Sequence, residues 1–215
     1  MSEITPEHLR LFEAALLESD RAGALQILQG FEAPTLDSLA DGLLVPVLER
    51  LGAAWEDGRI ALSQIYMAGR ICESLVGEHL DAVAPSSLVR PRVGVAAMCD
   101  HHALGKRLVQ SVLRSAGYAP FDYGQGIEAE ELAWRARADG VQALLVSTLM
   151  LRAALQVRTL VRLLAEDGGP RLPVIVGGAP FRLDPELWRE VGADAMGVSA
   201  VDGPRLISKL LGGVA

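Results

Sequence analysis

The 215-residue sequence has only two cysteines, Cys72 and Cys99, and they are not in a Cys-x-x-Cys spacing. Two cysteines cannot form the disulfide framework of a small secreted protein, so a reducing compartment is the simplest expectation. Long apolar runs are also missing, which excludes a membrane span, and Met1 to Leu9 is too polar for a signal peptide. We therefore expect a soluble cytoplasmic protein that does not bind a membrane.

The sequence also lacks a cluster of basic residues. The net charge is −7 and the basic residues are scattered along the chain. Because a nucleic-acid-binding protein needs basic surface opposite the phosphates, the sequence argues against a direct nucleic-acid partner. Half of the residues (50%) are hydrophobic, which is enough for a well-filled core in a chain of this length.

The first part of the chain has helical periodicity and no strand pattern. Helices are predicted within Thr5 to Gly30, over Ala22 to Leu28, from Thr35 or Asp37 to about Leu51, and over Leu62 to Val83. Pro46 lies inside the third helix, so we expect a break near Leu44 and Val45. The stretch from Trp55 to Ile60 is predicted to form a turn. Residues 1–84 are therefore expected to form a four-helix bundle.

A segment rich in proline and serine, residues 85–91, is predicted to link this bundle to a second domain. Residues 92–215 alternate strand and helix, which predicts an α/β domain with a five-stranded parallel sheet. The predicted strands are Val93 to Met98, Ala119 to Tyr123, Ala143 to Val146, Val174 to Val176 and Ala195 to Val198. The predicted helices are Lys106 to Ala116, Ala129 to Ala138, Arg152 to Ala165, Pro185 to Val191 and one after Gly203. Right-handed crossovers favour a flavodoxin-like strand order, with the switch point between the first and third strands.

Polar residues and glycines follow three of these strands. Asp100 to Gly105 follows the first strand, Ser147 to Leu149 the third, and Gly177 to Ala179 the fourth. Because the carboxyl ends of parallel strands share one rim, a single ligand could contact all three loops. A neutral imidazole binds a metal through one ring nitrogen while its other N–H donates to a carboxylate. His102 and Asp100 supply both parts.

Taken singly, these residues have simpler explanations. A loop histidine is more often a surface residue, Ser147 can cap the next helix, and Gly177 and Gly178 can permit a tight turn. Cys99 and His101 could join His102 in a zinc site, but adjacent residues diverge and a fourth ligand is missing. His101 also stays open as an alternative to His102, because only spacing favours the latter.

The pattern Asp100-x-His102-x-x-Gly105, followed by Ser147-x-Leu149 and Gly177-Gly178, resembles the signature of the cobalamin-binding domains of methionine synthase, corrinoid methyl carriers and related mutases. The resemblance implies a corrinoid whose own dimethylbenzimidazole base is displaced from cobalt. His102 would be the lower axial ligand, and Asp100 would bond the other imidazole nitrogen. Gly105 would admit the nucleotide tail, Ser147 and Leu149 would contact the displaced base, and Gly177 and Gly178 would line the tail pocket. Further cofactor contacts are expected from His101, Leu104, Val176, Ala179, Trp55 and Tyr66.

The helical segment resembles the cap module of the methyltransferase and light-sensing branches of this family, which argues against a mutase. The light-sensing branch has a Glu-His pair where this chain has Ile65 and Tyr66. Methionine synthases have Thr and Ser where this chain has Leu151 and Ala153, so a proton relay would stop at Asp100. Trp55 and Tyr66 are interpreted either as bundle core or as contacts to the upper face of the corrin.

The leading hypothesis is a corrinoid protein that carries a methyl group on cobalt between methyltransferase partners. Its expected partners are the methyl-donor and methyl-acceptor components and a reductive activator. On this hypothesis the chain is the corrinoid subunit of a methyltransferase system and not a complete enzyme. A cobalamin-dependent regulator that binds a transcriptional or signalling partner is the alternative, and cobalamin storage or delivery is a third. An apolar bundle face leaves a dimer open.

Overall fold

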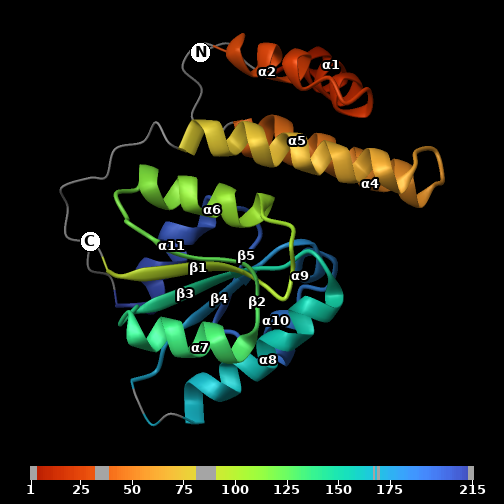
Figure 1. Cartoon of the computed structure of the whole chain (residues 1–215). Coiled ribbons are helices and arrows are strands. Elements are labelled where there is room, and N and C mark those ends of the chain that lie inside the picture. The colour runs from red at the N-terminus through yellow and green to blue at the C-terminus, as the bar shows by residue number, and fades with distance from the viewer. Residues whose placement is uncertain (1–3, 32–38, 81–90, 167, 169, 213–215) are drawn as a thin grey trace. The chain divides into compact units, whose positions relative to one another are not determined.

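The computed structural model describes residues 4–31, 39–80, 91–166, 168 and 170–212 (Figure 1). The chain divides into two compact units, Met1–Ala82 and Val83–Ala215. The predicted linker over residues 85–91 lies outside the described residues except at Pro91. None of the helices in the described ranges has the length and apolar character of a membrane span.

The first unit contains helices joined by turns and no strand among its described residues, as predicted. It contains α1 (Pro6–Leu17), α2 (Arg21–Gln29), the π-helical segment η1 (Ala40–Leu44), α4 (Val45–Glu56) and α5 (Leu62–Leu80). The helix α1 begins with Thr5 as N-cap and Pro6 in the first turn, because Thr5 accepts the backbone N–H of His8 and proline needs no donor there. Its buried side chains Phe12 and Leu16 are fully shielded from solvent.

The predicted break before Pro46 is confirmed. The π-helical segment η1 ends at Leu44 and α4 begins at Val45, with Pro46 in its first turn. Proline has no N–H for an intrahelical hydrogen bond, so a regular helix cannot run through this position from Ala40. The predicted turn begins later than expected, because Trp55 is still part of α4 and the cap is Asp57.

The second unit is a parallel α/β sheet. Its strands are β1 (Val93–Met98), β2 (Phe121–Ile127), β3 (Ala143–Ser147), β4 (Val174–Gly177) and β5 (Ala195–Gly197). Its helices are α6 (Leu104–Ser115), α7 (Ala129–Ala138), α8 (Leu151–Glu166), α9 (Ala179–Leu183), α10 (Leu187–Glu190) and α11 (Asp202–Leu210). The five strands lie in the order β2-β1-β3-β4-β5 and all pairs are parallel. The flavodoxin-like order is therefore confirmed, with the switch point between β1 and β3.

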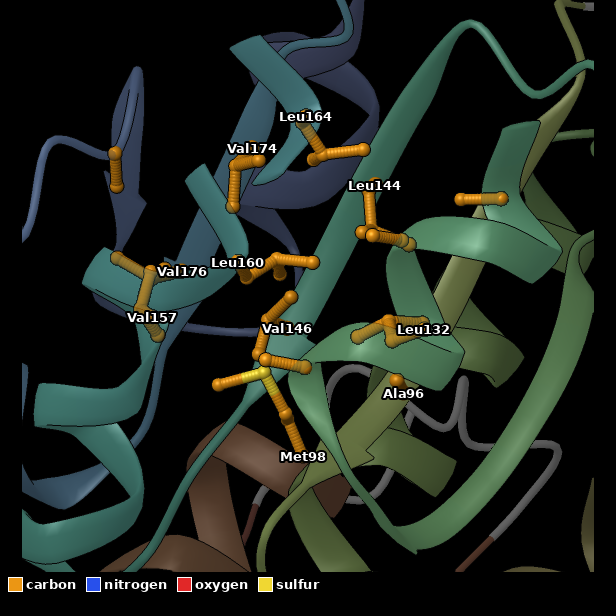
Figure 2. Close-up of a cluster of buried hydrophobic side chains, with 14 of the residues drawn as sticks. Ala96, Met98, Leu132, Leu144, Val146, Val157, Leu160, Leu164, Val174 and Val176 are labelled. Carbon is orange, nitrogen blue, oxygen red and sulfur yellow. The ribbon is translucent and has the colours of Figure 1, made fainter. Parts of the chain in front are cut away.

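The two faces of the sheet are covered by different helices, with α7 and α8 on one face and α6 and α11 on the other (Figure 1). Figure 2 shows the core beneath α7 and α8, where Ala96 and Met98 of β1 pack with Leu144, Val146 and residues of the helices. Val93 and Val95 point to the other face and join a second cluster. All six residues of β1 are buried, as expected for a strand covered on both faces.

In this unit, β2 and the helices that follow β4 differ from the sequence-based prediction. The strand β2 continues to Ile127, beyond the predicted end at Tyr123, because Gly124 and Gly126 have positive φ and allow an irregular pairing with β1. The predicted helix from Pro185 to Val191 is shortened to α10, and a further short helix, α9, starts directly after Gly178. Pro180 lies in the first turn of α9, where proline fits a helix.

Candidate functional site

The buried carboxylate of Asp100 holds together two of the three loops at the carboxyl-end rim of the sheet. Its Oδ1 accepts the backbone N–H of His102 at 3.0 Å and lies 2.5 Å from His102 Nδ1. Its Oδ2 accepts the backbone N–H groups of Leu149 and Met150 at 2.8 and 3.0 Å. The Asp100 side chain is 1% exposed. One side chain therefore fixes the loop after β1 against the loop after β3.

The imidazole of His102 is oriented by this carboxylate. An ionised carboxylate can only accept, so Nδ1 carries a proton, and in the neutral imidazole Nε2 then has the lone pair that binds a metal. The side chain of His102 is 46% exposed, in contrast to that of Asp100. In this pair the buried Asp100 carboxylate fixes the imidazole of His102, and Nε2 is the atom at the surface of the rim that could bind a metal.

The electrostatics of Asp100 favour its charged form. Burial alone would raise the pKa of its carboxyl, but hydrogen bonds from His102, Leu149 and Met150 lower the pKa below its ordinary value. The helix α8 begins at Leu151, directly after the two donor amides, so the partial positive charge at its amino end also favours the anion. Asp100 is therefore ionised at neutral pH.

The third loop joins the other two through backbone contacts. Ser147 pairs in register with Ala97 of β1 and with Gly177 of β4. The N–H of Thr148 donates to Gly177 O at 3.0 Å. Gly178 has a φ of +118°, and a Cβ there would overlap the backbone carbonyl oxygen of Thr148. Only glycine fits this close approach.

Gly105 permits a second close approach at the rim. A Cβ at this position would lie 2.5 Å from the hydroxyl oxygen of Ser147, across the start of α6. The backbone of α6 therefore approaches β3 at the point where the resemblance places the nucleotide tail. Leu104 and Gly105 open α6, Val176 is buried in β4, and Ala179 opens α9.

His101 does not share the environment of His102. Its ring lies against the backbone of Gly126 in β2, with Cε1 2.5 Å from the position that a Cβ of Gly126 would take. Cys99 is directed elsewhere too, because its thiol donates to Glu128 Oε2 at 3.3 Å. Burial, followed by the contact with Glu128, raises the pKa of the Cys99 thiol to about 11. In the part of the chain that the structure describes, no group of three or more His, Cys, Asp or Glu side chains could hold a metal ion, so the zinc alternative has no ligand set there.

Trp55 and Tyr66 lie in the helical unit, on α4 and α5. Trp55 is 45% exposed and Tyr66 is 57% exposed. Two apolar side chains close to them in sequence, Leu62 and Met67, are also exposed, at 62% and 42%. The interpretation of these two aromatic residues as bundle core is therefore wrong. They belong to a set of exposed apolar side chains near the junction of α4 and α5.

Sequence reasoning missed two parts of the site. The amides of Leu149 and Met150 are backbone groups, and no residue type in the sequence signals that they point at Asp100. Gly126 was not singled out, although glycine inside a strand pattern often marks a bulge or a close backbone approach. Its N–H donates to Asp100 O at 2.7 Å, so β2 also takes part in holding the loop after β1.

Comparison with known proteins identifies the family. A model described as "B12 binding domain" matches residues 91–203, and a second model with the same description matches residues 9–78. The chain belongs to the B12-binding domain family. The B12-binding match covers the whole rim described above, and the cofactor is the cobalamin predicted from the sequence.

Relatives and solved structures of B12-binding proteins agree with this. The chain is 27% identical to dimethylamine corrinoid protein 2 of Methanosarcina mazei over 170 residues, which are 76% of this chain and 78% of the relative. The structure of the Methanosarcina barkeri monomethylamine corrinoid protein has a TM-score of 0.81 and 22% identity, and the match covers 95% and 98% of the two chains. A methanol:cobalamin methyltransferase complex from Methanosarcina barkeri has a TM-score of 0.53 and 21% identity, with 99% of this chain and 83% of that chain covered. These two structural similarities show a shared fold.

The residues of the rim fit a corrinoid. A single imidazole with a free Nε2 suits a metal whose other ligands come from its own macrocycle, in contrast to zinc, which needs a larger set of protein ligands. Gly105 and Gly178 have no side chain because a Cβ there would meet Ser147 Oγ or Thr148 O, so both glycines permit the close packing of the loops around Asp100 and His102. The geometry thus agrees with the family.

Proposed function

We propose that this protein is a corrinoid methyl carrier that binds its cofactor with the lower base displaced and with His102 as the lower ligand. The observation that carries the proposal is the Asp100–His102 pair at the rim, in which a buried carboxylate sets the tautomer of an exposed imidazole. The names of its relatives support the role, because two of them are dimethylamine corrinoid proteins of Methanosarcina mazei.

Asp100 would act as the positioning residue of the site. Its hydrogen bonds to the amides of Leu149 and Met150 prevent the carboxylate from turning, so the imidazole of His102 keeps one orientation. A fixed, negatively charged partner also raises the basicity of Nε2 as a ligand. When bound, the corrinoid supplies a cobalt centre that accepts and releases a methyl group, and the protein supplies orientation and charge around it.

The remaining rim residues would hold the rest of the cofactor. We assign the nucleotide tail to the rim beside Gly105, Gly177 and Gly178, as the resemblance implies, with Ser147 bonding the displaced base. Leu149 is 45% exposed and would pack on that base. Leu104 and Ala179 would complete the walls of this tail site, and Val176, whose side chain packs in the core, would support it from within β4. His101 would contribute through the packing of its ring against Gly126.

The helical unit would shield the upper face of the corrin. Trp55 and Tyr66 are exposed and apolar, which suits contact with a flat macrocycle better than contact with water. The domains are proposed to comprise residues 1–84 and 92–215, joined by a linker over residues 85–91. The proposed partners are the methyl-donor and methyl-acceptor proteins of a methyltransferase system and a reductive activator, in the cytoplasm.

The test is reconstitution of the purified protein with methylcobalamin, followed by visible spectroscopy. We expect spectral evidence of base displacement, loss of the methyl group when a demethylating acceptor protein or thiol is added, and recovery with a reductant and methyl iodide. His102→Ala should abolish the histidine-ligated spectrum, whereas Glu7→Gln, an exposed position in the first turn of α1, should not. Binding without methyl exchange would instead favour a regulator or a storage protein, and absence of binding would end the corrinoid proposal.

A further inference from the structure

We propose that Gly126 is a positioning residue: the space left by its missing side chain seats the His101 ring and leaves His102 as the histidine available to the corrinoid. The inference rests on the proposed function and adds to it the means by which one of two adjacent histidines is selected. Sequence spacing alone does not make that choice.

The two histidines have different attachments. His102 is tied to Asp100 through both its backbone N–H and its Nδ1. The His101 ring lies at Gly126 instead, with Cε1 at 2.5 Å and Nδ1 at 2.9 Å from the position of a Cβ on that residue. Real Cβ contacts are longer than this, so the ring occupies volume that any other residue at 126 would fill. The seat exists because residue 126 is glycine.

The backbone around this seat is fixed by the same residue that holds His102. The N–H of Gly126 donates to Asp100 O at 2.7 Å, and the N–H of Cys99 donates to Ile127 O at 2.9 Å. Gly126 has a φ of +70°, which places it in the left-handed region that favours glycine. The pairing of β1 with β2 shifts register on both sides of Ala97, so the end of β2 curves to meet the loop. The backbone carbonyl of Asp100 therefore fixes the seat, while its carboxylate fixes the ligand.

A side chain at position 126 has a defined consequence. The His101 ring must leave its place, and because His101 is exposed and directly precedes His102, the displaced ring moves out over the rim. There it competes with His102 for the metal or obstructs the cofactor. The clash with His101 involves the end of a side chain and not backbone, and it adds to the backbone strain that any other residue has at a φ of +70°.

The chain offers a closely matched control for this variant. Gly124 has a φ of +82°, lies in the same strand, and has no described atom within 4 Å of an added Cβ. Gly124→Ala therefore introduces a comparable backbone strain without touching His101. The test set is Gly126→Ala, Gly124→Ala, His101→Ala and the double variant His101→Ala/Gly126→Ala.

Two measurements are made on these variants. The first is NMR of the apoprotein, which follows the contact between the His101 ring protons and the α-protons of Gly126 without any cofactor. The second is titration with hydroxocobalamin followed by visible spectroscopy, which gives the affinity and the ligation state. Thermal unfolding of each apoprotein checks that it is folded. If Gly126→Ala alone does not fold, the double variant, which has no His101 ring to displace, is compared with His101→Ala instead.

We expect the NMR contact in the wild type and in Gly124→Ala, and its loss in Gly126→Ala. Gly126→Ala should bind the corrinoid about tenfold more weakly than Gly124→Ala. The double variant has no His101 ring to displace, so its affinity should lie within about twofold of that of His101→Ala. Equal affinity of Gly126→Ala and Gly124→Ala, or no recovery in the double variant, overturns the inference. Loss of ligation in His101→Ala also overturns it, because His101 would then be a ligand. If the wild type binds no corrinoid, the proposed function fails. If the wild-type apoprotein shows no NMR contact between His101 and Gly126, the packing of the ring at Gly126 is refuted independently of any cofactor.

Discussion

Replacing Asp100 with Asn is the sharpest perturbation of the site, because it keeps the shape of the side chain and removes its charge. The carboxylate accepts four hydrogen bonds, two at Oδ1 and two at Oδ2. An amide has one oxygen, so its NH2 group must face either the two donors of His102 or the amides of Leu149 and Met150. At least two donors lose their acceptor.

The size of the effect follows from that count. A hydrogen bond to a charged group contributes about 1.5–3 kcal/mol, and part of the loss at exposed Leu149 and Met150 is recovered by water, so we expect Asp100→Asn to lower the free energy of unfolding by about 2–4 kcal/mol. For a unit of this size that corresponds to a fall in Tm of about 10 °C. The pair of variants Asp100→Asn and His102→Ala separates the anchor from the ligand. His102→Ala removes one partly exposed bond and should cost less than about 1 kcal/mol.

The assay is urea unfolding of the apoprotein followed by tryptophan fluorescence. Trp134 and Trp188 lie in the α/β unit and Trp55 in the helical unit, so variants with single tryptophans distinguish the two transitions. The control is Asp184→Asn, whose carboxylate accepts one local amide, that of Glu186, and which should change stability by less than about 0.5 kcal/mol. If Asp100→Asn is as mild as Asp184→Asn, the carboxylate is not the anchor described here.

Three further predictions concern pH and packing. The folded-state pKa values of Asp100, Asp122 and Asp202 are lowered, so below about pH 5 the unfolded chain binds more protons and stability falls as the pH falls through these pKa values; urea midpoints should show this, and Asp100→Asn should reduce the slope. Gly178→Ala should destabilise the apoprotein by about 2 kcal/mol more than Gly124→Ala, because its Cβ meets a backbone carbonyl; equal urea midpoints would contradict the close approach. Thr148→Val should be neutral or stabilising by up to about 1 kcal/mol, since the buried hydroxyl has no hydrogen-bond partner among the described residues; a loss above about 1 kcal/mol in the same assay would reveal a partner.

The sequence predicted those parts of the molecule that depend on residue type and periodicity. The buried strand Val93–Met98 follows from its apolar run, and the break before Pro46 follows from the missing N–H. The strand order followed from the handedness of the crossovers, and it placed Asp100, Ser147 and Gly177 at one rim. These features are set by local chemistry together with a few general rules of topology.

The features that escaped prediction depend on backbone groups and on solvent exposure. Amides such as that of Met150 have no sequence signal, and β2 extends to Ile127 because two glycines bend it and not because its residues are apolar. Exposure of Trp55 could not be derived either, since a helical apolar stripe is usually core and only the packing of the other helices shows which of its members are left outside.

Electron paramagnetic resonance of the protein loaded with cobalamin in its cobalt(II) state tests the central claim most directly. The protein is produced with histidine labelled with the heavy nitrogen isotope, while the cofactor keeps ordinary nitrogen. Ligation by His102 predicts that each cobalt line splits into a doublet, that the doublet persists in His101→Ala, and that it is lost in His102→Ala. A triplet in the labelled wild type, which reports the cofactor's own base on cobalt, would contradict the account.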